Sequence, residues 1–275
     1  MKTLIYQYWQ GPVARGVQSS MDNIKAYAER IGADYRLDLN KPQAVDVCGM
    51  PMRFEWLNPM IDPSFWEYDK IAIIDCDIWC TDNLTESVFD DFTAGVGACR
   101  EPFIEWLRGH TLHGHINSTQ DERWATKVKE LNVEAPRNEQ GKLKVYNAGM
   151  VLFSKEGLKY ARENWLTFKE YIDFMKGYPP YYTEDQAYLH TMCCGFGTDF
   201  QELDYSWNSQ VHHMSTRDNP TRRMNDTRPD NVRLVHLQCG DAAHFTEEEL
   251  YRVVNLPFEE WDLDLEKYRA GLRCL

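Results

Sequence analysis

The chain has 275 residues, of which 43% are hydrophobic and 13% aromatic, enough to build the core of one large α/β domain. Its formal net charge of -13 argues against a protein whose main task is to grip a nucleic-acid backbone, although it does not exclude a local basic groove. No apolar run approaches the roughly twenty residues of a membrane span, and we expect no signal peptide. Eight cysteines without a CxxC pair favour reduced thiols and a cytoplasmic location.

The first hundred residues alternate predicted strands and helices. A strand over 4–9, a helix over 21–31 that ends at Gly32, and a strand over 35–39 give a β-α-β opening typical of nucleotide-binding sheets. Further elements are predicted in the order helix from Pro51, strand 70–74, short helix 81–91 and strand 94–99.

Between residues 101 and 142 the apolar pattern is weakest, and only 122–131 predicts a helix; we interpret this stretch as an insertion that lines the site. Order returns at 144–153, a strand pattern in which Gly149 predicts a bulge or a close approach of the backbone to a ligand. No repeat or linker is evident, so we expect one domain. The remaining elements are predicted as a helix over 158–168, an aromatic loop over 178–182, a helix over 183–191, a strand over 232–237 and helical segments over 247–272 broken at Pro257.

Two aspartates follow directly on the predicted strand 70–74. Asp75 and Asp77 would lie at its carboxyl end, where open α/β sheets bind ligands. Two unit charges about 4 Å apart repel by roughly 4 kcal/mol at an effective dielectric of about 20, so such a pair needs a cation or a proton between its carboxylates. Mg²⁺ or Mn²⁺, which take oxygen ligands, meet that need. The alternative is a strand-end turn in which one aspartate caps the next helix.

A histidine in the last predicted strand adds a nitrogen ligand to this set. His236 lies within the apolar segment 232–237, soon followed by a glycine. A neutral imidazole beside two carboxylates would complete a protein face for Mn²⁺ and leave positions open for diphosphate oxygens. The alternative is a core histidine whose hydrogen bonds are satisfied within the protein.

Several ordered pieces of the sequence resemble one family. The segment 73–78, Ile-Ile-Asp-Cys-Asp-Ile, is similar to the hydrophobic-DxD motif of the GT-A nucleotide-sugar glycosyltransferases, most nearly family 8, the glycogenin and galactosyltransferase-like group. Arg53 stands where that family has a basic residue that touches the donor. Three further pieces resemble the family's donor-sugar strand, its acidic-Gln element and its late metal-binding motif: Tyr146-Asn147-Ala148-Gly149-Met150, Glu184-Asp185-Gln186, and Val235-His236 with Gly240.

The resemblance implies a single GT-A, Rossmann-like α/β domain over 1–275, with a mostly parallel central sheet flanked by helices and the DxD motif at the carboxyl end of a strand. The sequence departs from the family where His244-Phe245 replaces the lysine expected after Gly240, and no base-binding aspartate is evident near Tyr8. We expect a nucleotide-binding half, an insertion, an acceptor and metal half, and a C-terminal helical segment at 1–100, 101–143, 144–245 and 246–275.

The resemblance also implies a role for each matched residue. Asp75, Asp77 and His236 would hold Mn²⁺ or Mg²⁺, while Asp185 and Gln186 would be the catalytic residues beneath the anomeric carbon. The implied reaction moves a sugar from a nucleotide-diphosphate sugar, a UDP-sugar, to a hydroxyl of a glycan or another acceptor, with retention of configuration. The donor would be bound by Tyr8, Arg53, Asp75, Asn147, Ala148, Gly149 and Gly240.

Some of these residues have structural alternatives. Thr183 and Gln186 fit a helix capping box that would place Asp185 in the first turn. Residues 147–149 fit a simple strand bulge, and Arg53 fits an exposed helix position. A polar loop before the last strand would close over the diphosphate, receive an anionic acceptor or face solvent, and it contains Arg217, Arg222, Arg223 and Arg228.

Three rival functions remain open at the level of sequence. A phosphatase or phosphotransferase of the haloacid dehalogenase type also uses a DxD pair, but that family places it on the first strand and follows it with Thr or Val, whereas Ile78-Trp79 follows here. A silent sugar-binding or nucleotide-binding module would not need a complete set of metal ligands. A glycosyltransferase that acts on a modified DNA base keeps the fold and changes only the acceptor.

Overall fold

The computed structural model consists of two compact units whose segments alternate along the chain. The structure describes residues 1–41, 57–102, 105, 117–216, 219–226, 228–237 and 245–261. The side chains of these residues are described except at 212–216, 219–226 and 258. The first unit comprises Met1–Thr3, Pro42–Ile73 and Asp91–Leu203, and the second comprises Leu4–Lys41, Ile74–Asp90 and Asp204–Leu275. The fold is mixed α/β with a central, mostly parallel sheet flanked by helices, which confirms the predicted class.

The second unit opens with the predicted β-α-β segment. Strands β1 (Thr3–Trp9) and β2 (Asp34–Leu39) pair in parallel, and helix α1 (Arg15–Ile31) joins them. The helix starts six residues earlier than predicted. It ends at Gly32, whose φ of 70° lies in the left-handed region that glycine adopts without strain.

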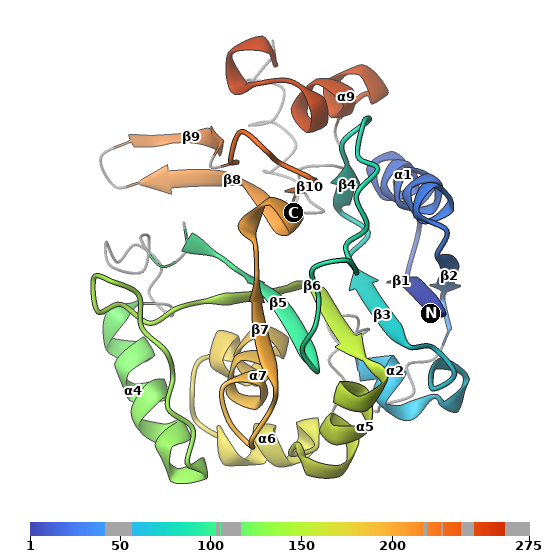
Figure 1. Cartoon of the computed structure of the whole chain (residues 1–275). Coiled ribbons are helices and arrows are strands. Elements are labelled where there is room, and N and C mark those ends of the chain that lie inside the picture. The colour runs from blue at the N-terminus through green and yellow to red at the C-terminus, as the bar shows by residue number, and fades with distance from the viewer. Residues whose placement is uncertain are drawn as a thin grey trace. The chain divides into compact units, whose positions relative to one another are not determined.

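A four-stranded sheet completes the second unit. Its order is β4-β10-β8-β9, formed by β4 (Ile78–Cys80), β8 (Ser209–Thr216), β9 (Asn219–Asp226) and β10 (Leu234–Leu237). Figure 1 shows β8 and β9 as a long hairpin. Helix α9 (Glu247–Asn255) begins in a capping box at Thr246 and packs its apolar side into one core with strands β4, β8 and β10.

The first unit contains β3 (Lys70–Ile74), β5 (Val96–Arg100), β6 (Tyr146–Ser154) and β7 (Phe200–Leu203). Strand β5 pairs antiparallel with β6 and parallel with β7. A Cβ atom on Gly157 would lie 1.8 Å from the carbonyl oxygen of Gly95, so only glycine allows this close contact. Among the described residues of this unit, the helices are α2 (Asn58–Ile61), α4 (Ser118–Val128), α5 (Lys155–Asn164), α6 (Phe168–Phe174) and α7 (Asp185–Cys193).

The short helix predicted over 81–91 is wrong, because this segment is a series of turns. Its apolar residues are spaced as in a helix, but side chains of α1 bind its backbone instead. The hydroxyl of Tyr27 donates to the carbonyl of Glu86 at 2.9 Å and accepts from the amide of Val88 at 2.9 Å. These bonds use groups that a helix would need for its own hydrogen bonds.

Other boundaries also differ from the prediction. The helix predicted over 158–168 is divided into α5 and α6, and residues 219–226 form strand β9 where a polar loop was predicted. Of the helix predicted from Pro51, the first residues lie outside the described part and the last form α2. Residues 262–275 of the predicted C-terminal helical segment also lie outside it.

None of the helices in the described part of the chain combines the length and the apolar character that a bilayer crossing requires. The described cysteines are thiols and not disulfides, as the sequence predicted, and they are Cys76, Cys80, Cys99, Cys193 and Cys194.

Candidate functional site

Asp75, Asp77 and His236 come together in the second unit. One ligand atom from each side chain lies within 4.8 Å of the other two. Asp77 and His236 are only 6% and 8% exposed, whereas Asp75 is partly exposed. The Nε2 atom of His236 lies 3.3 Å from Oδ1 of Asp77. The fold therefore joins the predicted aspartate pair to a histidine from a distant strand.

Strand pairing brings Asp77 and His236 together. Strand β4 begins one residue after Asp77 and pairs antiparallel with β10, so that His236 lies opposite Ile78. The amide of Leu237 donates to the carbonyl of Asp77 at 2.8 Å, which extends the pairing to the motif itself. Because side chains alternate across a strand, a slip of one residue would turn His236 to the opposite face of the sheet.

His236 has a second partner that the sequence did not indicate. Its Nδ1 atom lies 3.0 Å from Oδ1 of Asn208, which is fully buried. Asn208 ends the short 3₁₀-helix η5 (Tyr205–Asn208), directly before β8. It reaches the histidine because β8 runs parallel beside β10, a pairing that no sequence motif announces.

Buried side chains hold the backbone around the aspartates. Nε2 of Gln7 donates to the carbonyl of Asp75 at 3.1 Å, and Oγ of Ser20 donates to the carbonyl of Ile78 at 2.6 Å. Both donors are 0% exposed, so water does not compete for these bonds. The turn that carries the DxD pair is therefore fixed from β1 and from α1.

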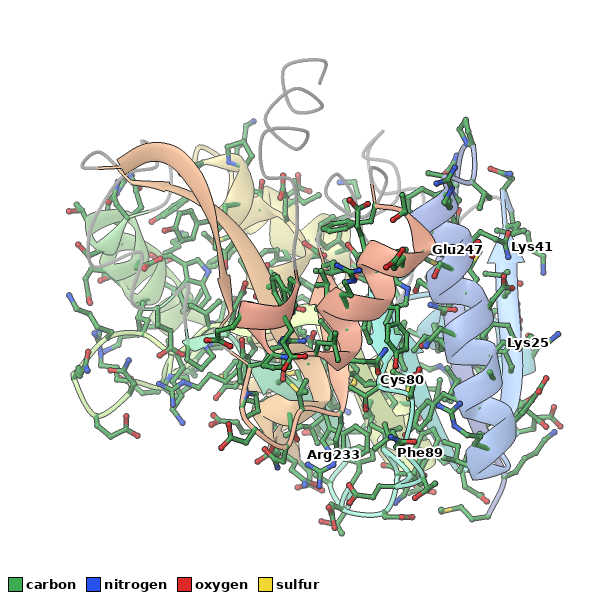
Figure 2. The ribbon with its side chains drawn as sticks, turned by 90° about the horizontal axis from the view of Figure 1, so that it is seen from above. Lys25, Lys41, Cys80, Phe89, Arg233 and Glu247 are labelled. Atoms are coloured by element: carbon green, nitrogen blue, oxygen red, sulfur yellow. The ribbon has the colours of Figure 1, made fainter. Side chains whose placement is uncertain are left out.

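Asn23 of α1 holds β4 at its outer edge. Its Oδ1 accepts from the amide of Cys80 at 2.6 Å, and its Nδ2 donates to the carbonyl of Cys80 at 3.0 Å. Figure 2 shows Cys80 beside α1, while Lys25 of the same helix points away from the fold. Burial raises the pKa of the Cys80 thiol to about 11, so this cysteine is a neutral packing residue and not a thiolate ligand.

The cluster has the chemistry of a site for a hard divalent cation. Oδ1 of Asp77 is buried and has no hydrogen-bond donor among the residues that the structure describes. Burying a carboxylate oxygen without a partner raises the free energy of the folded state, and a bound cation would offset this penalty. Two carboxylates and one imidazole suit Mn²⁺ or Mg²⁺ better than a softer metal. Asp75, Asp77 and His236 could therefore hold such an ion.

A second group of predicted residues lies in the first unit, on β6. The pairing of β5 with β6 shifts register between Tyr146 and Val151, the stretch in which Gly149 predicted a bulge or a close approach to a ligand. Within it, Oδ1 of Asn147 accepts from the amide of Gly149 at 2.8 Å. Asn147 and Ala148 are 8% and 7% exposed. The backbone of this segment therefore departs from regular pairing with β5.

The start of α7 differs from the predicted capping box. The residue at the cap is Glu184, and its side chain makes no capping hydrogen bond. The hydroxyl of Thr183 instead donates to the carbonyl of Pro180 at 2.9 Å. The capping box assigned to Thr183 and Gln186 is therefore wrong, because Thr183 ends a 3₁₀ turn and does not begin the helix.

Gln186 contacts a carboxylate that sequence reasoning missed. Its Nε2 donates to Oε2 of Glu101 at 2.6 Å. Glu101 is 5% exposed and directly follows β5, at the start of the stretch with no clear apolar pattern. A carboxylate only accepts hydrogen bonds when ionised, so the amide nitrogen of Gln186 faces Glu101 and its oxygen faces away.

The remaining predicted residues are dispersed or outside the described part. Tyr8 is buried in β1, and its hydroxyl donates to the carbonyl of Lys41 at 2.7 Å. Arg53 and Gly240 lie outside the described residues, as does Arg217.

Arg228 has a structural partner in the second unit. Its guanidinium donates to the carbonyl of Val253 at 2.5 Å and to that of Leu256 at 2.8 Å, at the end of α9. It also lies over the ring of Trp261, at 4.9 Å from the centroid. These contacts satisfy carbonyls that the helix end leaves open, which favours a capping role over diphosphate binding.

The comparison with protein families decides the class of the chain. It matches the sequence profile of Glycosyl transferase family 8 over residues 60–242, about two thirds of its length. The chain belongs to glycosyltransferase family 8. It is therefore an enzyme that uses a nucleotide sugar, as its motifs predicted. The matched range includes Asp75, Asp77 and His236, and it leaves out Tyr8 and Arg53.

Solved structures similar to this family 8 glycosyltransferase are distant in sequence. Galactosyltransferase LgtC, in complex with donor and acceptor sugar analogues, is 15% identical with a TM-score of 0.49, and the alignment covers 99% of this chain and 96% of that one. A glycosyltransferase involved in glycosylation of the major capsid of PBCV-1 is 11% identical, with a TM-score of 0.49 and coverage of 87% and 94%. Mouse xyloside xylosyltransferase 1 is 14% identical, with a TM-score of 0.48 and coverage of 87% and 98%. The comparison with curated proteins found no match.

Proposed function

We propose that this enzyme moves a sugar from a UDP-sugar to an acceptor hydroxyl, in a reaction that depends on Mn²⁺ or Mg²⁺ and retains the anomeric configuration. The observation that carries the proposal is the cluster of Asp75, Asp77 and His236 around a buried carboxylate oxygen that has no described hydrogen-bond donor. Membership of family 8 supplies the reaction class, and the cluster supplies a place for the cation.

The exposure of the three residues suggests a different role for each in binding. Asp77 and His236 would bind the cation from the buried side, while the partly exposed Asp75 would contact the cation or the donor ribose. When bound, the cation neutralises the negative charge that develops on the diphosphate as the sugar leaves. Burial of Asp77 and His236 lowers the local dielectric, which strengthens their attraction for a cation.

The first unit offers groups for the donor sugar. The register shift between β5 and β6 lies in the segment that carries Asn147, Ala148 and Gly149, and backbone and side-chain groups of this segment would bind sugar hydroxyls. Asp185 or Gln186 would stabilise positive charge on the anomeric carbon, on the sugar face opposite the diphosphate. Gln186 suits this task because its Oε1 is the atom turned away from Glu101.

The acceptor is proposed to be a hydroxyl of a glycan. A hydroxymethylated base in DNA is the rival acceptor, and the net charge of -13 counts against it. The cysteines, which are thiols in the described residues, agree with a reducing compartment such as the cytoplasm.

The test is to incubate the whole chain with a panel of UDP-sugars, with Mn²⁺, with Mg²⁺ and with EDTA. Release of UDP and transfer to oligosaccharides or to hydroxymethylated DNA are measured, and the anomeric configuration of the product is read by NMR. Asp77→Asn should reduce metal-dependent turnover by a factor of about 100 or more, since it removes a direct ligand.

Asp82→Asn is the matched control, because it makes the same change on an exposed residue of the second unit. Full activity in EDTA, or undiminished activity in Asp77→Asn, would overturn the metal assignment. A product of inverted configuration would overturn the assignment of retention and leave the metal site standing.

A further inference from the structure

The histidine of the proposed cation site can exist in two neutral forms, and only one of them binds a metal from the Asp77 side. If the proton is on Nε2, it occupies the side of the ring that lies 3.3 Å from Oδ1 of Asp77, and no lone pair remains there for a metal. If the proton is on Nδ1, Nε2 presents a lone pair and is a ligand. The form with the proton on Nε2 therefore excludes a cation from this nitrogen, and the form with the proton on Nδ1 admits one.

Asn208 faces the other nitrogen of this ring. Its Oδ1 lies 3.0 Å from Nδ1 of His236, and both residues are buried. An amide oxygen only accepts hydrogen bonds, so this contact requires the proton to be on Nδ1. The bare Nε2 then faces a carboxylate oxygen that lacks a described donor, and two acceptors in contact favour a cation over an empty gap.

We propose that Asn208 is a positioning residue that holds His236 in the Nδ1-protonated form and so keeps its Nε2 and the Oδ1 of Asp77 from closing into a hydrogen bond with each other. Asn208 is 0% exposed, so it acts through the histidine and not by touching donor or acceptor. The proposal rests on the proposed cation site at Asp75, Asp77 and His236.

Hydrogen bonds on both sides hold the backbone segment that carries Asn208 in place. The side chain of Asp204 caps η5 by accepting from the amide of Ser206 at 2.9 Å. The amide of Arg233 donates to the carbonyl of Ser206 at 2.9 Å, which ties η5 to the start of β10. The two segments that carry Asn208 and His236 are thus joined both by strand pairing and by this bond. Partners of metal-binding histidines typically change metal affinity by 10-fold to 100-fold when removed.

Two substitutions separate the proposal from a general packing role. Asn208→Leu keeps the branched shape of the side chain and removes the acceptor, and it should weaken Mn²⁺ binding by roughly 10-fold to 100-fold. Asn208→Asp keeps the acceptor, and its affinity should stay within about threefold of wild type or improve. Asn58→Leu removes a different buried asparagine, in the first unit, and should leave Mn²⁺ affinity unchanged. Free Mn²⁺ is followed by electron paramagnetic resonance during titration of the full chain.

A second readout needs neither metal nor activity. Long-range ¹H–¹⁵N correlations of the metal-free protein report which ring nitrogen of neutral His236 carries the proton. Wild type should show Nδ1–H, and Asn208→Leu should shift the ring toward Nε2–H. An Nε2–H ring in wild type overturns the proposal, even if the leucine variant fails to fold.

The outcomes distinguish failure of the cation site from failure of the role of Asn208. Wild-type protein that binds no Mn²⁺ but shows the Nδ1–H form refutes the cation site and supports the effect of Asn208 on the ring. Wild-type protein that binds Mn²⁺ with the same affinity as folded Asn208→Leu refutes the role of Asn208 and keeps the site.

Discussion

Replacing Asp77 by asparagine should stabilise the metal-free protein while it abolishes stabilisation by Mn²⁺. Asp75 and Asp77 each place a carboxylate oxygen within 4.8 Å of the other. At that distance two charges repel by about 3 kcal/mol at an effective dielectric of about 20, and the partial exposure of Asp75 reduces this value. An asparagine amide can also donate to Nε2 of His236, a bond worth about 1 kcal/mol. We expect the free energy of unfolding to rise by about 1–3 kcal/mol, or roughly 3–10 °C in Tm.

The assay is thermal unfolding followed by circular dichroism, in EDTA and in excess Mn²⁺. Wild type should gain about 2.7 kcal/mol when free Mn²⁺ is 100 times its Kd, because the ion binds only the folded state. Asp77→Asn should gain nothing, and the exposed control Asp82→Asn should behave as wild type in both buffers. An Asp77→Asn protein that melts below wild type in EDTA would refute the repulsion between the two carboxylates. An equal rise in the Tm of both proteins with Mn²⁺ would refute the role of Asp77 as a ligand.

Three further substitutions test the support of the site and the fold. Asn23→Ala should lower the free energy of unfolding by about 2–4 kcal/mol in urea denaturation, because it leaves the buried amide and carbonyl of Cys80 without their partner. Glu101→Gln should lower kcat by roughly tenfold or more, with little change in donor KM, because the amide of Gln186 is then free to turn over. Gly157→Ala should lower the Tm sharply or prevent folding, since its Cβ would lie 1.8 Å from a backbone oxygen just before β5.

Each of these expectations has a contrary result. Asn23→Ala protein as stable as wild type would show that β4 does not depend on this side chain. A full loss of kcat in Glu101→Asp, which keeps a carboxylate acceptor, would contradict the orienting role assigned to Glu101. An unchanged Tm in Gly157→Ala would show that Gly157 does not lie in close contact with the backbone of Gly95.

The sequence predicted those parts of the fold whose apolar pattern is strong. The run from Lys70 to Ile74 is buried on both faces, so its Ile-rich composition was enough to indicate a central strand and to place Asp75 and Asp77 at its end. Short or polar strands gave no such signal. β4 has three residues, and β9 consists mainly of polar residues, with Asn219-Pro220 at its start.

The candidate site shows the same division. His236 stood out because a histidine in an apolar strand is unusual, and the DxD motif stood out by its spacing. Asn208 and Glu101 did not stand out, because their roles arise from contacts between segments distant in the sequence. Strand β8 pairs with β10, and Glu101 at the end of β5 bonds to Gln186 of α7. The prediction of a helix over 81–91 was wrong for a related reason. The hydroxyl of Tyr27, in α1, binds backbone groups of this segment that a helix would need, and the local sequence does not show this contact.

The alternation of the two units along the chain has a consequence for biosynthesis. The second unit receives its last segment only after residue 204, when the whole of the first unit has already been made. A nascent chain that ends before His236 carries Asp75 and Asp77 without their third ligand, and β4 without the strand that pairs with it. Ribosome-bound intermediates that end before His236 should therefore hold no cation at Asp75 and Asp77, and the proposed site becomes complete only after β10 has been made.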